Sequence, residues 1–339
     1  MIRNFGRIAG SLALAASALT FVAAAQQQAP VAPKEVPQAP AQTQATPAAP
    51  APTGEAPKFP PPDPKNFTAT SPTADQVNAF LTASWGYDES RVWQVQAITK
   101  TQVDGVSKVI VYIGDKSGKE KPSALLFWAM PDGKHIIAGE DMYPFGSNPY
   151  AEYRTKLQAE ADGPWRGSAD KTLEMVEFAD FQCPHCKVAQ ANMEKLATDF
   201  PKAHIVFQNY PLEGIHPQAK VAADYGVCVA KLGSNHAFFL FADDVFNGQE
   251  GLATADGAQL TLKSAVSKAG LDPEKVAACA AEPATSAEVE KSVKLARDLN
   301  INQTPMLLIN GRQVPVAGLA YDTLKKIVEY QEKLDGIQQ

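Results

Sequence analysis

The sequence has few metal-binding side chains and lacks a long hydrophobic run beyond its N-terminus. Only four cysteines and five histidines occur among 339 residues, and a single C-x-x-C pair is present. Zinc sites usually need two such pairs, or cysteine with histidine at ligand spacing, so we predict no metal site. No later stretch approaches the roughly 18–20 apolar residues of a spanning helix. A net charge of −6 argues against a nucleic-acid partner.

The N-terminus has the features of an export signal. Arg3 and Arg7 precede the apolar run 8–22, which ends in three alanines before Gln26. A charged segment, an apolar segment and a small-residue cleavage site are typical of a signal peptide. We therefore predict a cleaved signal at 1–25 and export to an oxidising compartment, most simply a bacterial periplasm. An uncleaved membrane anchor is the alternative.

Residues 26–66 consist mainly of Ala, Pro, Gln and Thr. This composition contains almost nothing that could form a core and favours extended, partly polyproline chain. We predict a disordered linker, which would also serve as a membrane tether if the N-terminus is retained.

Residues 67–162 are predicted to form a small α+β domain. The Asp104-Gly105 dipeptide is a strong hairpin signal between two strand-like runs. No catalytic group of residues is visible in this domain, which would dimerise, bind substrate or act as a spacer. Its predicted elements are helices at 72–84 and 149–161 and strands at 91–102, 106–114, 123–130 and 135–138.

Residues 163–339 alternate between strand and helix patterns and are predicted to form an α/β domain. Helices at about 212–299 interrupt a βαβ start and a ββα end. The first helix is predicted to bury Val188, Ala189, Met193, Leu196 and Phe200. The other predicted elements are strands at 172–181, 204–210, 306–309 and 314–316 and helices at 184–200 and 321–334.

The C-x-x-C pair lies where the first strand of this domain meets its helix. The residues are Cys183, Pro184, His185 and Cys186. Unpaired N–H groups at a helix N-terminus favour a thiolate, and proline suits the first helical position. One helical turn separates the cysteines, which allows a small redox-active disulfide. A structural disulfide and half of a zinc site are the alternatives.

Several motifs together resemble the thioredoxin fold as elaborated in DsbA-like thiol:disulfide oxidoreductases. The resemblance covers about Trp165 to the C-terminus. It implies a thioredoxin-like α/β fold with an inserted α-helical domain, preceded here by the small α+β domain. The motifs are Val176-Glu177-Phe178 before the C-P-H-C sequence, Tyr210-Pro211-Leu212 with Ile215-His216-Pro217, Thr304-Pro305 and Asn310-Gly311.

The resemblance implies roles for the residues of the motif. Cys183 would be the nucleophile and Cys186 the resolving thiol, with their disulfide in place of any bound cofactor. His185 would stabilise the Cys183 thiolate, making the protein more oxidising; an ordinary surface histidine is the alternative. Glu177 would be a buried acid that relays a proton to or from Cys186; a solvent-facing glutamate is the alternative.

Pro305 resembles the cis-proline that faces the disulfide in thioredoxin-like proteins. A cis bond there would expose the backbone of Thr304 to bind a substrate strand. An ordinary trans proline at a strand start is the alternative. The best-known DsbA oxidases have valine before this proline, so threonine leaves the direction of electron transfer open.

The remaining cysteines lie in the inserted helices. Because an even cysteine count in an exported protein favours pairing, we predict a Cys228–Cys279 structural disulfide, with two buried free thiols as the alternative. Asp272 and Pro273 are predicted to open the helix of Cys279. The segment 285–288 is predicted to be a capping box for the next helix.

These observations predict an exported protein thiol:disulfide oxidoreductase acting on reduced or misfolded exported proteins. A dithiol oxidase, reoxidised by a membrane redox partner, is the leading hypothesis. A dimeric isomerase or reductase, kept reduced by a partner, is the alternative, because the domain at 67–162 loosely resembles the dimerisation domain of DsbC-like isomerases. A non-catalytic chaperone with this fold is the third hypothesis.

Overall fold

The structure, a computed structural model, describes residues 59–118 and 121–338. The predicted signal peptide and most of the predicted linker lie outside these residues. The prediction that the disordered linker extends to residue 66 is wrong, because residues 59–66 are placed against the first sheet. The Phe59 ring lies 6.2 Å from the Tyr112 ring, and Gln96 donates to the Pro60 carbonyl at 3.0 Å. An aromatic contact and a hydrogen bond from a buried amide therefore join this proline-rich segment to the sheet.

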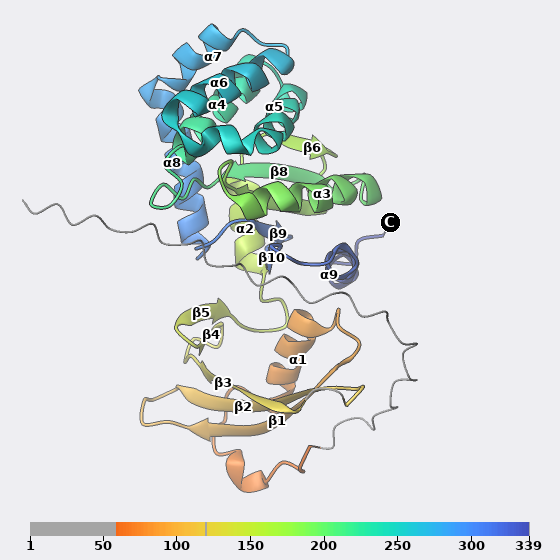
Figure 1. Ribbon diagram of the computed structural model, residues 1–339. Helices are drawn as coiled ribbons and strands as arrows, with labels where there is room; N and C mark the ends of the chain where they lie inside the picture. Colours follow the sequence, from red (N-terminus) through yellow and green to blue (C-terminus); the bar gives the residue numbers. More distant parts are fainter. Residues whose placement is uncertain (1–58, 119–120, 339) are drawn as a thin grey trace, which may run out of the picture. The chain divides into compact units, whose positions relative to one another are not determined.

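The first sheet has five antiparallel strands in the order β1-β2-β3-β4-β5 (Figure 1). Helix α1 begins with a capping box between Thr73 and Gln76, and buries Val77 and Leu81 against the sheet. The strand β5 was not predicted from the sequence. The elements are η1 (Pro64–Asn66), α1 (Ala74–Trp85), β1 (Arg91–Lys100), β2 (Ser107–Asp115), β3 (Ser123–Ala129), β4 (His135–Ala138) and β5 (Asp141–Pro144).

The second sheet has the order β10-β9-β7-β8-β6, with β7 and β8 parallel and the other pairs antiparallel. Every residue of the central strand β7 is buried. The strand β6 was not predicted. The elements are α2 (Ala151–Glu160), β6 (Trp165–Gly167), β7 (Glu174–Ala179), α3 (Pro184–Asp199), β8 (His204–Asn209), β9 (Met306–Ile309), β10 (Arg312–Pro315) and α9 (Tyr321–Leu334).

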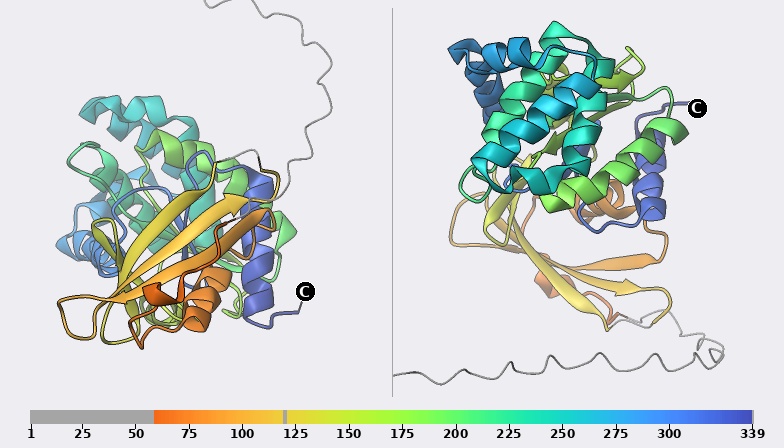
Figure 2. Two further views of the ribbon diagram at one scale, coloured as in Figure 1. Left: turned by 90° about the horizontal axis from the view of Figure 1, so that it is seen from below. Right: turned by 45° about the horizontal axis from the view of Figure 1, so that its top comes forward.

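Helices cover both faces of this sheet (Figures 1 and 2). α3 and α9 pack on the face that carries Met175, whereas α2 and α8 pack on the face of Val176 and Phe178. The insertion between β8 and β9 forms a further core around Phe181, Phe238 and Phe241. Its elements are α4 (Ala219–Leu232), α5 (Asn235–Asn247), η2 (Gln249–Ala253), α6 (Ala255–Lys268), α7 (Pro273–Ala280) and α8 (Pro283–Asp298). The predicted thioredoxin-like α/β fold and the small α+β unit are therefore confirmed.

Two local predictions on helices were wrong. Val188 is 70% exposed, although the other predicted core residues of α3 are buried. It precedes Ala189 by one residue, and a step of one residue turns about 100° around the helix, away from the sheet. The predicted capping box at Thr285 does not form, because α8 begins at Pro283 and places Thr285 in its first turn. The Thr285 hydroxyl instead donates to the Cys279 carbonyl at 2.8 Å.

Arg312 joins β10 to the end of α1. Its side chain is buried and donates to the Ser84 carbonyl at 2.9 Å, to the Tyr150 hydroxyl at 3.1 Å and to the Gln331 side chain at 2.9 Å. It also donates to the Ala83 carbonyl. The guanidinium thus satisfies carbonyl groups that the C-terminus of a helix leaves without partners.

We expect Arg312→Met to lower the free energy of unfolding by about 3 kcal/mol, because buried carbonyls would lose a charged donor. Urea unfolding of the full chain measures this. The matched control is Arg91→Met, because Arg91 pairs with Asp88 at a partly exposed site and should cost less than about 1 kcal/mol. Equal losses in the two variants would contradict the role given to Arg312.

Candidate active site: a thiol pair at a strand–helix junction

The C-P-H-C sequence bridges the end of β7 and the start of α3. A turn closes between the Cys183 N–H and the Asp180 carbonyl at 3.1 Å, and Cys183 is the N-cap of α3. Pro184 occupies the first helical position, as predicted. The Cys186 N–H donates back to the Cys183 carbonyl at 3.1 Å. Both cysteines are free thiols, so the structure represents the reduced pair.

The pKa values of the two thiols are shifted in opposite directions. A hydrogen bond from the Cys186 thiol, with help from Thr304 and the backbone N–H groups of Cys186 and His185, lowers the pKa of Cys183 to about 5. Burial, followed by the hydrogen bond and charge of Cys183, raises the pKa of Cys186 well above its usual value. Cys183 is therefore suited to exist as a thiolate, and Cys186 as a thiol.

His185 lies on the first turn of α3 with an exposed side chain. It contributes a backbone N–H to the stabilisation of the Cys183 thiolate. The predicted electrostatic role of its imidazole stays a prediction.

The Thr304–Pro305 peptide bond is cis. This loop lies opposite the cysteines, since the Cys183 thiol is 3.7 Å from the Thr304 carbonyl oxygen. Thr304 and Pro305 are buried, whereas Asn302 and Gln303, just before them, are exposed. The site thus combines the junction of β7 and α3 with the loop before β9, which lies 121 residues further along the chain.

Glu177 is buried on β7, with 3% of its surface exposed. Gln190 of α3 donates to its carboxylate at 2.9 Å and to the Cys186 carbonyl at 3.3 Å. Burial raises the pKa of Glu177 to about 7, although Arg166 and Gln190 act in the opposite direction. A carboxyl group with this pKa exchanges protons near neutral pH, which the predicted relay to Cys186 requires.

Glu177 also makes stability depend on pH. Because its folded pKa lies above the ordinary 4.5, the folded chain binds more protons than the unfolded chain between pH 4.5 and 7. Its contribution to stability is thus lost as the pH rises through this window. We expect Glu177→Gln to raise the free energy of unfolding by about 2–3 kcal/mol at pH 8 and to change it little at pH 4. Urea unfolding at both pH values measures this, with exposed Glu152→Gln as the control; a Glu177→Gln effect equal at both pH values would contradict the assignment.

Sequence reasoning missed several polar side chains that hold the C-P-H-C loop. The Gln249 amide of η2 donates to the carbonyls of Phe181 and Cys183 at 2.8 and 2.9 Å. Gln182 donates to the Leu252 carbonyl at 3.0 Å and accepts from the Gln218 N–H at 2.8 Å. The insertion is therefore fastened directly to the redox loop. Gln182 beside the cysteines was the available signal, but its partners lie 36 and 70 residues away in the sequence.

Asp180 is the other side chain that sequence reasoning undervalued. It is 1% exposed, and its carboxylate accepts hydrogen bonds from the Gln182 and Leu212 N–H groups at 2.7 and 2.8 Å. His216 Nδ1 donates to the same carboxylate at 2.8 Å. His216 lies in the loop before α4, which begins at Ala219.

The remaining cysteines lie in the insertion. Cys228 of α4 and Cys279 of α7 form a disulfide across a sequence separation of 51 residues. Asp272 caps α7 and Pro273 follows it, as the sequence predicted.

The rest of the described chain contains neither a metal site nor a spanning helix. Across residues 59–118 and 121–338, no group of three His, Cys, Asp or Glu side chains is arranged to bind a metal ion. Over the same ranges, no helix combines the length and apolar character needed to cross a bilayer. In the first sheet, His135 is paired with Asp132 at 2.6 Å.

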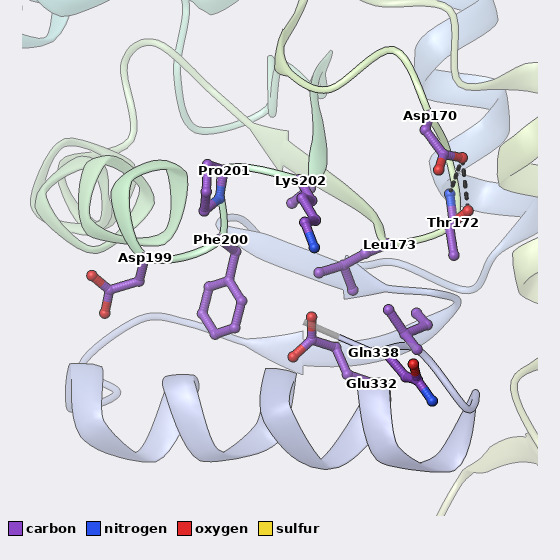
Figure 3. A pocket seen from close by; sticks show the side chains of 11 residues that line it. Asp170, Thr172, Leu173, Asp199, Phe200, Pro201, Lys202, Glu332 and Gln338 are labelled. Carbon is purple, nitrogen blue, oxygen red and sulfur yellow. Dashed lines mark hydrogen bonds between the residues drawn. The ribbon is translucent and has the colours of Figure 1, made fainter.

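A hollow of about 330 Å³ lies near the first residues of β7 and β8, whereas the thiol pair follows the last residue of β7 (Figure 3). Leu173, Phe200, Lys202 and Glu332 are among the residues that line it. None of the predicted site residues lines it. The hollow is therefore not part of the site around the thiol pair.

A family profile described as Thioredoxin matches residues 159–330, about half of the chain. The chain belongs to the thioredoxin family. The matched residues contain the thiol pair, the cis-proline loop and the insertion, so the predicted thioredoxin-like family is confirmed.

Curated relatives of this thioredoxin-family chain are named as antiporters. It is 28% identical over 148 residues to the Na(+)/H(+) antiporter NhaA 3 of Salinispora tropica, covering 44% of this chain and 22% of that protein. It is 30% identical over 149 residues to NhaA 1 of Mycolicibacterium vanbaalenii, covering 43% and 23%. The chain thus spans less than a quarter of the length of these relatives, and antiport is an activity named for those proteins.

Solved structures with similar folds include Proteus mirabilis ScsC, at 22% identity and TM-score 0.44, covering 55% of this chain and 82% of that one. Bacillus subtilis BdbD is 24% identical with TM-score 0.46, covering 52% and 95%. Wolbachia pipientis alpha-DsbA2 is 21% identical with TM-score 0.45, covering 53% and 96%. At these identities and TM-scores, the similarities define neither substrate nor partner.

Proposed function

We propose that this chain is an exported dithiol oxidase that introduces disulfides into reduced proteins. The observation that carries the proposal is the unequal pair of thiols at one helix N-terminus. The low pKa of Cys183 stabilises the reduced form of the pair. Stabilising the reduced form makes the disulfide form a stronger oxidant.

In the proposed reaction, a substrate thiolate attacks the Cys183 sulfur of the oxidised pair. A substrate–Cys183 disulfide forms, the Cys183–Cys186 bond breaks, and its electron pair stays on Cys186. A second substrate thiolate then attacks the substrate sulfur of the mixed disulfide. The substrate leaves with a new disulfide, and Cys183 leaves as a thiolate. Its low pKa makes Cys183 a good leaving group in this second step.

Thr304 and Pro305 are proposed to bind the substrate chain beside its cysteine. The Thr304 carbonyl lies against the Cys183 thiol, so a peptide on this loop would present its sulfur to Cys183. Backbone hydrogen bonds to an extended strand tolerate many side chains, which suits an enzyme with many protein substrates.

Export is proposed from the N-terminal sequence, with an oxidising compartment as the place of action. The Cys228–Cys279 disulfide supports it, because structural disulfides persist in such compartments. A membrane redox partner would reoxidise Cys183 and Cys186 after each turnover, and an uncleaved N-terminus would act as a tether.

Disulfide isomerase or reductase is the second candidate, favoured by the α+β domain at 67–162 and by Thr304. In that case the domain would form a homodimer. Sizing chromatography of the mature chain tests this, because the oxidase proposal requires no dimer; a stable dimer with isomerase activity would favour the second candidate.

The two candidates differ in the substrate that they turn over. The oxidised chain is expected to restore activity to fully reduced ribonuclease, and to act poorly on ribonuclease with scrambled disulfides. Cys183→Ser is the control for both assays. Rapid recovery of scrambled ribonuclease by the reduced chain would replace the oxidase proposal with isomerase. Recovery that is unchanged in Cys183→Ser would leave the non-catalytic chaperone.

A further inference from the structure

Cys186 receives a hydrogen bond from a residue outside the C-P-H-C sequence. The backbone N–H of Asp180 donates to the Cys186 sulfur at 3.5 Å. Burial and the neighbouring charges of Cys183 and Glu177 raise the pKa of Cys186, whereas this N–H lowers it. The contact therefore favours negative charge on a sulfur whose surroundings otherwise oppose it.

The exchange reaction puts negative charge on this sulfur. When a thiolate attacks Cys183 in the oxidised pair, the electron pair of the broken bond moves to Cys186. In the reverse direction, the Cys186 thiolate attacks the mixed disulfide on Cys183. A donor already aimed at the sulfur stabilises the charge that develops there and needs no rearrangement during the reaction.

The Asp180 side chain fixes the direction of its own backbone. Its buried carboxylate accepts from the Gln182 N–H within the same loop, and from the Leu212 N–H and His216 Nδ1 across a sequence distance of 32 to 36 residues. The loop that carries the donor is thus fastened to the loop between β8 and α4. Loss of one of these bonds would let the Asp180 N–H move away from the sulfur.

Of these three donors to the Asp180 carboxylate, His216 is the one that uses its side chain. Its ring is 16% exposed and the Asp180 carboxylate is fully covered. The His216 N–H donates to the Leu212 carbonyl at 2.9 Å, which fixes the turn from which the ring reaches Asp180. None of the steps of the proposed reaction uses this side chain directly.

We propose that the Asp180 N–H stabilises the Cys186 thiolate during exchange, and that His216 is a positioning residue that holds Asp180 for this task. The proposal rests on the proposed thiol–disulfide activity of Cys183 and Cys186. It assigns a function to the Ile215-His216-Pro217 segment, which lies about 30 residues from the cysteines in the sequence.

The test measures the reaction of the oxidised full chain with reduced glutathione by stopped flow. We expect His216→Ala to slow the attack that releases Cys186 by about fivefold, the value of one modest hydrogen bond. His216→Asn should react within about twofold of the wild type, because its amide can place an N–H close to that of Nδ1. In both reduced variants, the pH profile of Cys183 alkylation should match that of the wild type.

The matched control is His135→Ala, which removes another His–Asp pair, in the first sheet. It should leave every rate unchanged. If His216→Ala fails to fold, Asp180→Asn tests the same link, because an amide oxygen accepts more weakly than a carboxylate; about threefold slowing is expected.

A wild-type rate in His216→Ala would overturn the proposal, as would equal slowing in His216→Ala and His216→Asn. A shift of the Cys183 alkylation profile together with the rate would also overturn it, because that result indicates general loosening of the site. An oxidised wild type that does not react with glutathione would instead contradict the proposed function. The two failures are therefore distinguishable.

Discussion

Replacing Cys183 with serine is expected to abolish thiol–disulfide exchange, with a loss of at least about a thousandfold in the oxidation of reduced ribonuclease. Serine keeps the size of the side chain but lacks a sulfur that can form the mixed disulfide. Since the Cys183 side chain makes no capping hydrogen bond to the first turn of α3, the fold should be retained. The oxidation rate and the circular dichroism spectrum measure the two expectations.

Cys186→Ser is the informative partner variant. It retains the acidic nucleophile but lacks the thiol that resolves the mixed disulfide. When this variant is given ribonuclease with scrambled disulfides, the Cys183 thiolate attacks a substrate disulfide, one substrate thiolate leaves, and substrate joined to Cys183 should accumulate. Mass spectrometry after acid quenching measures this adduct. Oxidation by Cys183→Ser at the wild-type rate, or adducts on Cys186 in place of Cys183 in the wild type, would contradict the assigned roles.

Removing the second disulfide by the double change Cys228→Ser and Cys279→Ser is expected to lower the free energy of unfolding by about 4 kcal/mol. The bond closes a sequence separation of 51 residues and joins α4 to α7 inside a buried core. Opening that loop gives the unfolded chain more conformations. Urea unfolding, with the midpoint and slope both fitted, measures the loss.

The same double variant separates structural from redox roles. At a temperature where the variant remains folded, its initial rate with reduced ribonuclease should stay within about twofold of the wild type, because neither cysteine belongs to the reacting pair. A large loss of rate without a loss of stability would mean that this disulfide takes part in electron transfer.

The elements with strong periodicity could be predicted from the sequence. β7, α3, β9 and α9 have long apolar patterns or clear boundaries, and β9 and α9 begin and end at the predicted residues. β5 and β6 were missed because they are short: Asp141–Pro144 has few strand-forming residues, and Trp165–Gly167 has only three residues. Their pairing to β4 and β8 defines them, and that pairing is a tertiary property.

The reactive residues of the site could also be found in the sequence, but the residues that hold the redox loop by hydrogen bonds could not. Cys183 and Cys186 have a diagnostic spacing. Asp180 is close to them in the sequence, but nothing in the sequence shows that its carboxylate is buried through bonds to a distant loop. Gln249 carries no local signal, because its amide acts only after the insertion packs against the redox loop.

The reduction potential of the Cys183–Cys186 pair tests the central claim most directly. It is measured by equilibrating the full chain with glutathione buffers and counting free thiols. The low pKa of Cys183 predicts a potential more oxidising than about −180 mV, together with thiolate absorbance that persists down to about pH 5. A value of about −270 mV, typical of thioredoxin, would contradict the account and identify a reductase.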